Sequence, residues 1–214
     1  MRKTFDAELI ELGEELTAMA AQAQDAIDMV TASLTTGEAA QAHSAIEMTG
    51  SMDQMERDLE NHCMRLLLRQ QPVARDLRTI STALKMVTDL QRIGDQASNI
   101  AEIALLLAGQ SHRAVVPEDI QLMSRRAGLM VKQAIAAYAS RDQGAAHAVI
   151  NLDDEVDELF VRVKSELTGR IAEKAPGSDS AVDLIIIAKY LERVADHAVN
   201  IAKWAIFCVT GELQ

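Results

Sequence analysis

The feature that most constrains the fold of this chain is a twelve-residue segment that occurs twice. LQRIGDQASNIA at 90–101 aligns with LERVADHAVNIA at 191–202, an offset of 101 residues. A segment that recurs at such a distance indicates an internal duplication. We therefore expect two equivalent halves, a first domain over 1–110 and a second over 111–214.

The composition favours long helices in both halves. Of the 214 residues, 49% are hydrophobic but only 3% are aromatic, and only 3 Pro and 10 Gly occur. Such a chain has enough apolar residues for a full core and few residues that break helices. We expect helices near 4–35, 38–70, 74–108, 117–140, 143–174 and 179–209, separated by turn residues. The predicted fold class is all-α, with two tandem three-helix bundles.

The repeated helices carry two strips of opposite character. Apolar residues recur every three or four positions, at 184, 187, 191, 194, 198, 201, 205 and 208 in the last helix and at 90, 93, 97, 100, 104 and 107 in the third. This spacing places them on one face of each helix, which we expect in the core. The polar residues between them should face outward: Gln91, Asp95 and Asn99 in the third helix, and Glu192, Asp196 and Asn200 in the last.

Four carboxylates of the second half are candidates for binding a cation. Glu192 and Asp196 lie one helical turn apart, where like charges repel, and Asp153 and Asp157 form a similar pair in the preceding helix. Both pairs are nearly equidistant from the turn at Pro176, so antiparallel pairing brings them level. Carboxylate oxygens suit hard cations such as Mg²⁺, Mn²⁺, Ca²⁺ or oxidised iron. The alternative is that these carboxylates are simply solvated and paired with nearby lysine and arginine side chains.

The first half has fewer carboxylates at the equivalent positions, which are Thr49, Asp53, Gln91 and Asp95. Two of the four acidic side chains are therefore missing. On charge alone we expect the second half to hold a cation more tightly than the first.

Net charge and missing motifs exclude several functions. The formal charge of −11 disfavours binding to nucleic acid. The sequence shows neither an export signal nor an apolar run long enough to span a membrane, and the isolated cysteines, Cys63 and Cys208, suit a reducing compartment, so we expect a cytoplasmic protein. No phosphate-binding loop or nucleophile motif is present, so the sequence predicts no enzyme.

The segments LLLRQQPVARDLRTISTALKMVTDLQRIGD at 66–95 and AKYLERVADHAVNIAKWAIFCVTGE at 188–212 resemble the PhoU family of phosphate-uptake regulators. The resemblance extends over essentially the whole chain. It implies two three-helix bundles, frequent dimerisation, and negative regulation of phosphate-starvation genes. The implied partners are a phosphate ABC transporter and a membrane sensor histidine kinase.

The resemblance also implies metal clusters bound through Glu/Asp-x-x-x-Asp motifs. These motifs map onto Asp153 with Asp157 and onto Glu192 with Asp196. In the first half, Gln91 and Thr49 stand where the family pattern has acidic residues, which leaves Asp53 and Asp95. A divalent or trivalent metal ion is expected, and the candidates are Mg, Mn, Fe and Zn.

Three functional hypotheses follow. The first is a non-enzymatic adaptor that docks on the transporter or the kinase. The second is a metal-binding or storage protein with no signalling role. The third is a metal-assisted hydrolase, which only the carboxylate cluster favours.

Overall fold

Six long helices account for most of the chain. The structure is a computed structural model, and it describes residues 2–70, 72–110, 115–175 and 178–212. The helices are α1 (Arg2–Thr36), α2 (Ala39–Gln70), α3 (Ala74–Ala108), α4 (Glu118–Ser140), α5 (Gln143–Ala172) and α6 (Ala181–Thr210), with a short 3₁₀ turn, η1 (Ser178–Ser180), before α6. These bounds confirm the all-α prediction. The predicted bounds differ from the observed ones by at most two residues, at the starts of α1 and α6 and at the end of α5, after which Lys174 has a positive φ of 50°.

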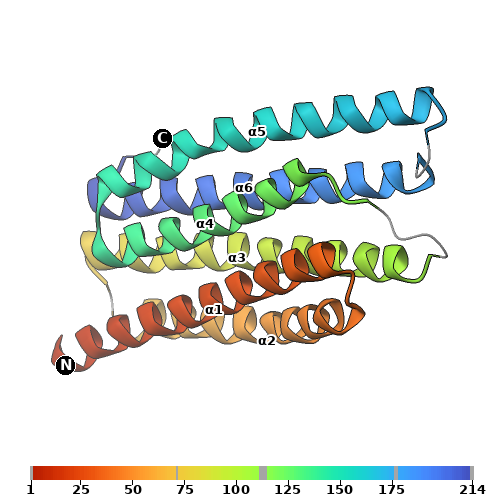
Figure 1. The fold of residues 1–214 in the computed structure, drawn as a ribbon. Coiled ribbons are helices and arrows are strands. Elements are labelled where there is room, and N and C mark those ends of the chain that lie inside the picture. The colour runs from red at the N-terminus through yellow and green to blue at the C-terminus, as the bar shows by residue number, and fades with distance from the viewer. Residues whose placement is uncertain (1, 71, 111–114, 176–177, 213–214) are drawn as a thin grey trace.

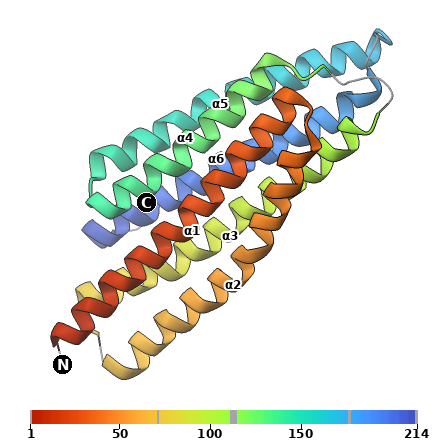
Figure 2. The same ribbon diagram turned by 60° about the horizontal axis from the view of Figure 1, so that its bottom comes forward.

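Four of the helices form a row in the order α2, α3, α6, α5, in which each contacts the next (Figures 1 and 2). Helices α1 and α4 lie across one side of this row: α1 contacts α2 and α3, α4 contacts α5 and α6, and the two contact each other. Each half is thus a three-helix bundle, as predicted, and the bundles pack side by side. The domain boundary expected between 110 and 111 adjoins residues 111–114, which are outside the described residues.

The predicted apolar strips form the core. All of their residues in α3 and α6 are buried. Burial extends beyond one strip in both helices, because α3 and α6 contact each other as well as the two other helices of their own bundles. The buried apolar residues of both halves therefore form one continuous cluster.

Small residues permit close helix packing at two points. A Cβ on Gly94 of α3 would lie 2.7 Å from the Met52 Sδ of α2, and a Cβ on Gly128 of α4 would lie 2.9 Å from the Gln24 Nε2 of α1. Both distances are too short for an added methyl group. An added methyl group at either position would require the Met52 or Gln24 side chain to move, so glycine lets these side chains lie against the facing helix.

Polar contacts also join the two halves along α3 and α6. The His197 Nδ1 of α6 lies 2.9 Å from the Asp89 Oδ1 of α3, and the Asn200 amide donates to the same oxygen at 3.3 Å.

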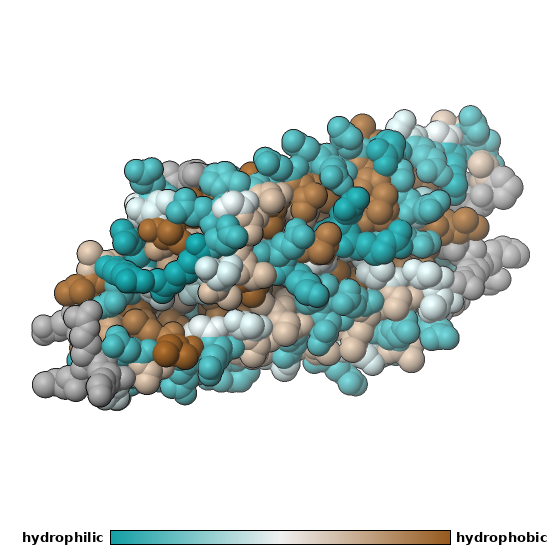
Figure 3. Space-filling model, turned by 60° about the vertical axis from the view of Figure 1, so that its left-hand side comes forward, coloured by the Kyte–Doolittle hydropathy of each residue, from teal (hydrophilic) through white to brown (hydrophobic). Residues whose placement is uncertain are grey.

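On the outside of the molecule, hydrophobic side chains form separate patches among hydrophilic ones (Figure 3). Among the described residues, no helix is both long and apolar enough to cross a membrane.

Candidate functional site: two carboxylate faces

The four candidate carboxylates of the second half lie close together, as their spacing predicted. Asp153 and Asp157 project from α5, and Glu192 and Asp196 project from α6, which runs antiparallel beside it. Their negative charges act on one another across the two helices. We call the four residues the second-half acidic face.

The pKa values of this face reflect burial and mutual repulsion. Partial burial raises the pKa of Asp153 to about 6, and the negative charges of Asp157, Asp196, Asp154 and Glu192 add to the effect. Burial also raises the pKa of Asp157, followed by repulsion from Glu192 and Asp196. The face therefore concentrates negative charge that the protein itself compensates incompletely.

One cationic side chain offsets part of this charge. The Lys189 ammonium donates to Glu192, lowers the pKa of Asp157, and lies 5.4 Å from the centre of the Phe160 ring. In the described part of the chain, no three carboxylate, imidazole or thiol side chains are arranged as a ready ligand set for a metal ion. The donor chemistry of the face suits a hard cation, but coordination would require Glu192 to leave Lys189 and the carboxylates to converge.

In the first half, an amide side chain lies between two of the carboxylates. The Gln91 side chain donates to Asp53 and, at 3.4 Å, to the Asp95 Oδ1, so one NH₂ group bridges the two carboxylates. The prediction that Gln91 faces outward is wrong, because its side chain lies between α2 and α3 with only 9% of its surface exposed. Asp95 also accepts from Arg92 at 3.2 Å.

A further acidic residue belongs to this first-half acidic face, which we define as Asp53, Glu56 and Asp95. Burial raises the pKa of Glu56, followed by repulsion from Glu60 and Asp53 and a smaller contribution from Asp95. Comparison of the two halves could not identify Glu56 as a site residue, because Phe160 occupies the equivalent position in the second half. The buried Thr49 hydroxyl donates to the Ile46 carbonyl of its own helix at 3.0 Å, so its proton is not available to these carboxylates.

Taken together, the fold and these faces define a class of protein: a duplicated three-helix bundle that presents one acidic face in each half. The halves are equivalent in backbone but differ in how the carboxylates are held: the Gln91 amide and Arg92 contact the first face, and Lys189 contacts the second.

Comparison with known proteins supplies the family. The model of the PhoU domain matches residues 16–104 and again 120–205, once in each half. The chain therefore belongs to the PhoU family. Relatives named phosphate-specific transport system accessory protein PhoU homolog share 35% identity in Clostridium acetobutylicum (99% of this chain, 96% of the relative) and 37% in Aquifex aeolicus (96% and 93%).

Solved structures agree with this assignment. The crystal structure of PhoU from Pseudomonas aeruginosa superposes with a TM-score of 0.93 at 31% identity, covering 97% of this chain and 100% of that one. The phosphate transport system regulatory protein PhoU from Streptococcus pneumoniae has the same fold, with a TM-score of 0.89 at 23% identity over 98% and 99% of the two chains.

Proposed function

We propose that this protein regulates phosphate uptake and represses the phosphate-starvation response. In this role it acts in the cytoplasm, as a homodimer, as a non-enzymatic adaptor between a phosphate ABC transporter and a membrane sensor histidine kinase. The observation that carries the proposal is the match of both halves to the PhoU domain. Full-length relatives carry the name of phosphate transport accessory proteins, which supports a role beside the transporter.

The geometry suits an adaptor. The row of four helices presents a broad side that α1 and α4 do not cover. Each acidic face is formed by two neighbouring helices of this row. A surface of fixed helices with charges at two separated positions can select a partner by electrostatic complementarity.

Deletion of the gene tests this proposal. In medium rich in phosphate, the deletion strain should express phosphate-uptake genes that the parent represses, and a plasmid copy should restore repression. Unchanged expression would contradict the regulatory role. Co-purification of the tagged protein with transporter or kinase subunits from membranes measures the adaptor step separately.

A second candidate function is metal binding or storage, which the second-half acidic face favours. The repulsion that raises the pKa of Asp153 and Asp157 is relieved by a bound cation. We propose Asp153, Asp157, Glu192 and Asp196 as ligands, with Asp53 and Asp95 forming a weaker site in the first half. Mg, Mn, Fe and Zn remain the candidate metals.

Elemental analysis of protein purified without chelator tests the metal site. The double variant Glu192→Gln with Asp196→Asn should lose bound metal. The matched control is Asp154→Asn with Glu158→Gln, an exposed acidic pair one turn apart on α5. Equal metal content in the two double variants would refute the ligand assignment. If the first variant loses metal yet still represses phosphate-uptake genes, the cation is not required for regulation.

A further inference from the structure

An open cavity lies between the two halves at the end of the molecule where α1 begins and α4 and α6 end (Figure 1). Its volume is about 450 Å³, within the range of small-molecule sites. Helix α1 forms one wall, the last turn of α4 and the residue that follows it form the other, and Thr79 of α3 and Cys208 of α6 close it further. Neither half can form this cavity alone, and it does not involve the acidic faces.

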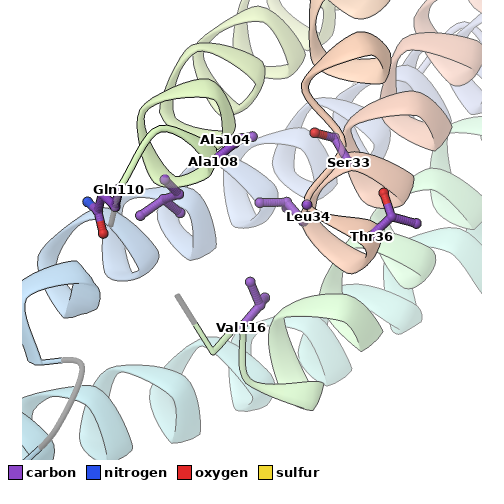
Figure 4. A pocket seen from close by; sticks show the side chains of 9 residues that line it. Ser33, Leu34, Thr36, Ala104, Ala108, Gln110 and Val116 are labelled. Carbon is purple, nitrogen blue, oxygen red and sulfur yellow. The ribbon is translucent and has the colours of Figure 1, made fainter. Parts of the chain in front are cut away.

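Because the chain is duplicated, this cavity can be compared with the equivalent place in the other repeat. The two PhoU domains are offset by 104 residues at their starts and 101 at their ends. These offsets relate Tyr138 to Leu34 and Cys208 to Leu107. Leu34 and Leu107 line a smaller cavity of about 170 Å³ at the opposite end, shown in Figure 4. The two cavities are therefore equivalent places in the two repeats.

The chemistry of the two places differs. The smaller cavity is lined by aliphatic residues such as Leu34, Leu107 and Val116, together with the polar residues Ser33, Thr36 and Gln110. In the larger one, a phenol and a thiol stand where the leucines stood, and the Thr79 hydroxyl lies 3.9 Å from the Cys208 Sγ. The Tyr138 hydroxyl has no hydrogen-bond partner among the described residues, and its side chain is partly buried. The difference between the two places thus lies at these two positions, and both cavities have polar as well as apolar lining residues.

Arg141 provides an independent observation. It follows α4 with φ of 56°, in the left-handed region that disfavours side chains, whereas Gly37 occupies the equivalent place after α1 with φ of 73°. A non-glycine residue in this conformation costs about 1 kcal/mol or more, and such strain concentrates at functional sites. Within the described residues, the Arg141 guanidinium forms no ion pair.

The charges of the rim define the ligand. Arg141 attracts an anionic group, and Leu9, Ile10 and Ala139 provide apolar contacts for the rest of a molecule. Glu14 lies on the same rim and, in the described part of the chain, is also without an ion pair. Its negative charge repels ligands that carry several negative charges, so a single carboxylate fits best.

We propose that this cavity binds a small monocarboxylate with an apolar body, whose carboxylate pairs with Arg141 beside the Tyr138 hydroxyl. A guanidinium and a carboxylate form charge-assisted hydrogen bonds, which are stronger than neutral ones. The site is independent of the proposed regulatory function, and its failure would leave that function untouched.

Titration of the full-length protein with 3-phenylpropionate, followed by NMR chemical shifts and calorimetry, tests the proposal. We expect saturable binding with shifts at residues around the cavity, and binding at least about tenfold weaker for the neutral amide of the same compound. Arg141→Gly should raise the unfolding temperature, because it restores the residue type found at Gly37, and should weaken binding of the carboxylate at least about tenfold. A variant that is more stable yet binds poorly separates ligand binding from folding.

A second variant blocks the space itself. A Cβ added to Gly13 of α1, on the cavity wall, meets no atom within 4 Å, so Gly13→Leu should fold and fill the cavity. Gly169→Leu on α5 is the matched control, since a Cβ there also meets no atom within 4 Å and the residue lies outside the cavity. We expect loss of binding only in Gly13→Leu. No saturable binding to the unmodified protein, or equal binding by both leucine variants, would overturn the proposal.

Discussion

Asp153 should destabilise the metal-free protein near neutral pH. Burial and neighbouring carboxylates raise its pKa from 3.8 to about 6. The folded state therefore holds this proton more tightly than the unfolded state, and stability falls as the pH rises from about 4 to 6. At about 1.4 kcal/mol for each pKa unit, the shift corresponds to at most about 3 kcal/mol. Screening by solvent at a partly exposed carboxylate reduces the expected effect to about 1 kcal/mol.

Asp153→Asn removes the charge with little change in shape, so it should stabilise the protein at pH 7 by about that amount. Urea unfolding in the presence of chelator measures this, and with a slope of about 2 kcal/mol per M the midpoint should increase by about 0.5 M. At pH 4 the difference between variant and parent should nearly vanish, because the parent carboxyl is then largely protonated.

Asp154→Asn is the control, because Asp154 is an exposed neighbour on the same helix. It should change stability less than Asp153→Asn does. Added Mn²⁺ should stabilise the parent and not Asp153→Asn if the acidic face binds the cation. If Asp153→Asn lowers stability at pH 7, or keeps the full pH dependence between 4 and 6, the account of uncompensated repulsion is wrong.

Three further predictions concern the first half and the contact between halves. Gln91→Glu places a third negative charge between two carboxylates, so it should lower stability in chelator by about 1–3 kcal/mol in urea unfolding and increase Mn²⁺ binding in calorimetry. Gly94→Ala should destabilise by about 1–3 kcal/mol because the added methyl meets the Met52 Sδ, whereas Gly50→Ala, with no atom within 4 Å of its added Cβ, should be neutral or slightly stabilising. His197→Ala should cost about 1–2 kcal/mol in the same assay, because it leaves a partly buried carboxylate of α3 with only a weak amide donor.

The periodicity of the sequence was sufficient to predict the helices and their buried faces. Helical amphipathicity is a local property, so the apolar strip from Leu184 to Cys208 could be predicted without knowledge of its partners. The sequence also predicted that the carboxylates of α5 lie level with those of α6, because two antiparallel helices joined by a short turn have a fixed register. These residues are Asp153 and Asp157 on α5, and Glu192 and Asp196 on α6.

The surroundings of the first-half acidic face could not be predicted in the same way. Gln91 is polar and occupies the position of Glu192 in the repeat, so the sequence predicted an exposed side chain. In the structure it is buried: its NH₂ group donates to the carboxylates of Asp53 and Asp95, while its Oε1 has no hydrogen-bond partner among the described residues. A buried polar residue is stable when its partners are present, and those partners come from two helices.

By itself the sequence determined that the chain is a duplicated, all-helical protein, since repetition and helical spacing are properties of neighbouring residues. The tertiary structure alone decided which helices stand in the middle of the row and what lies between the halves. The cavity next to Arg141 is lined by four helices from both repeats. The residue pattern of a single helix cannot predict the distance between these helices, because that distance is set by how the two bundles pack together.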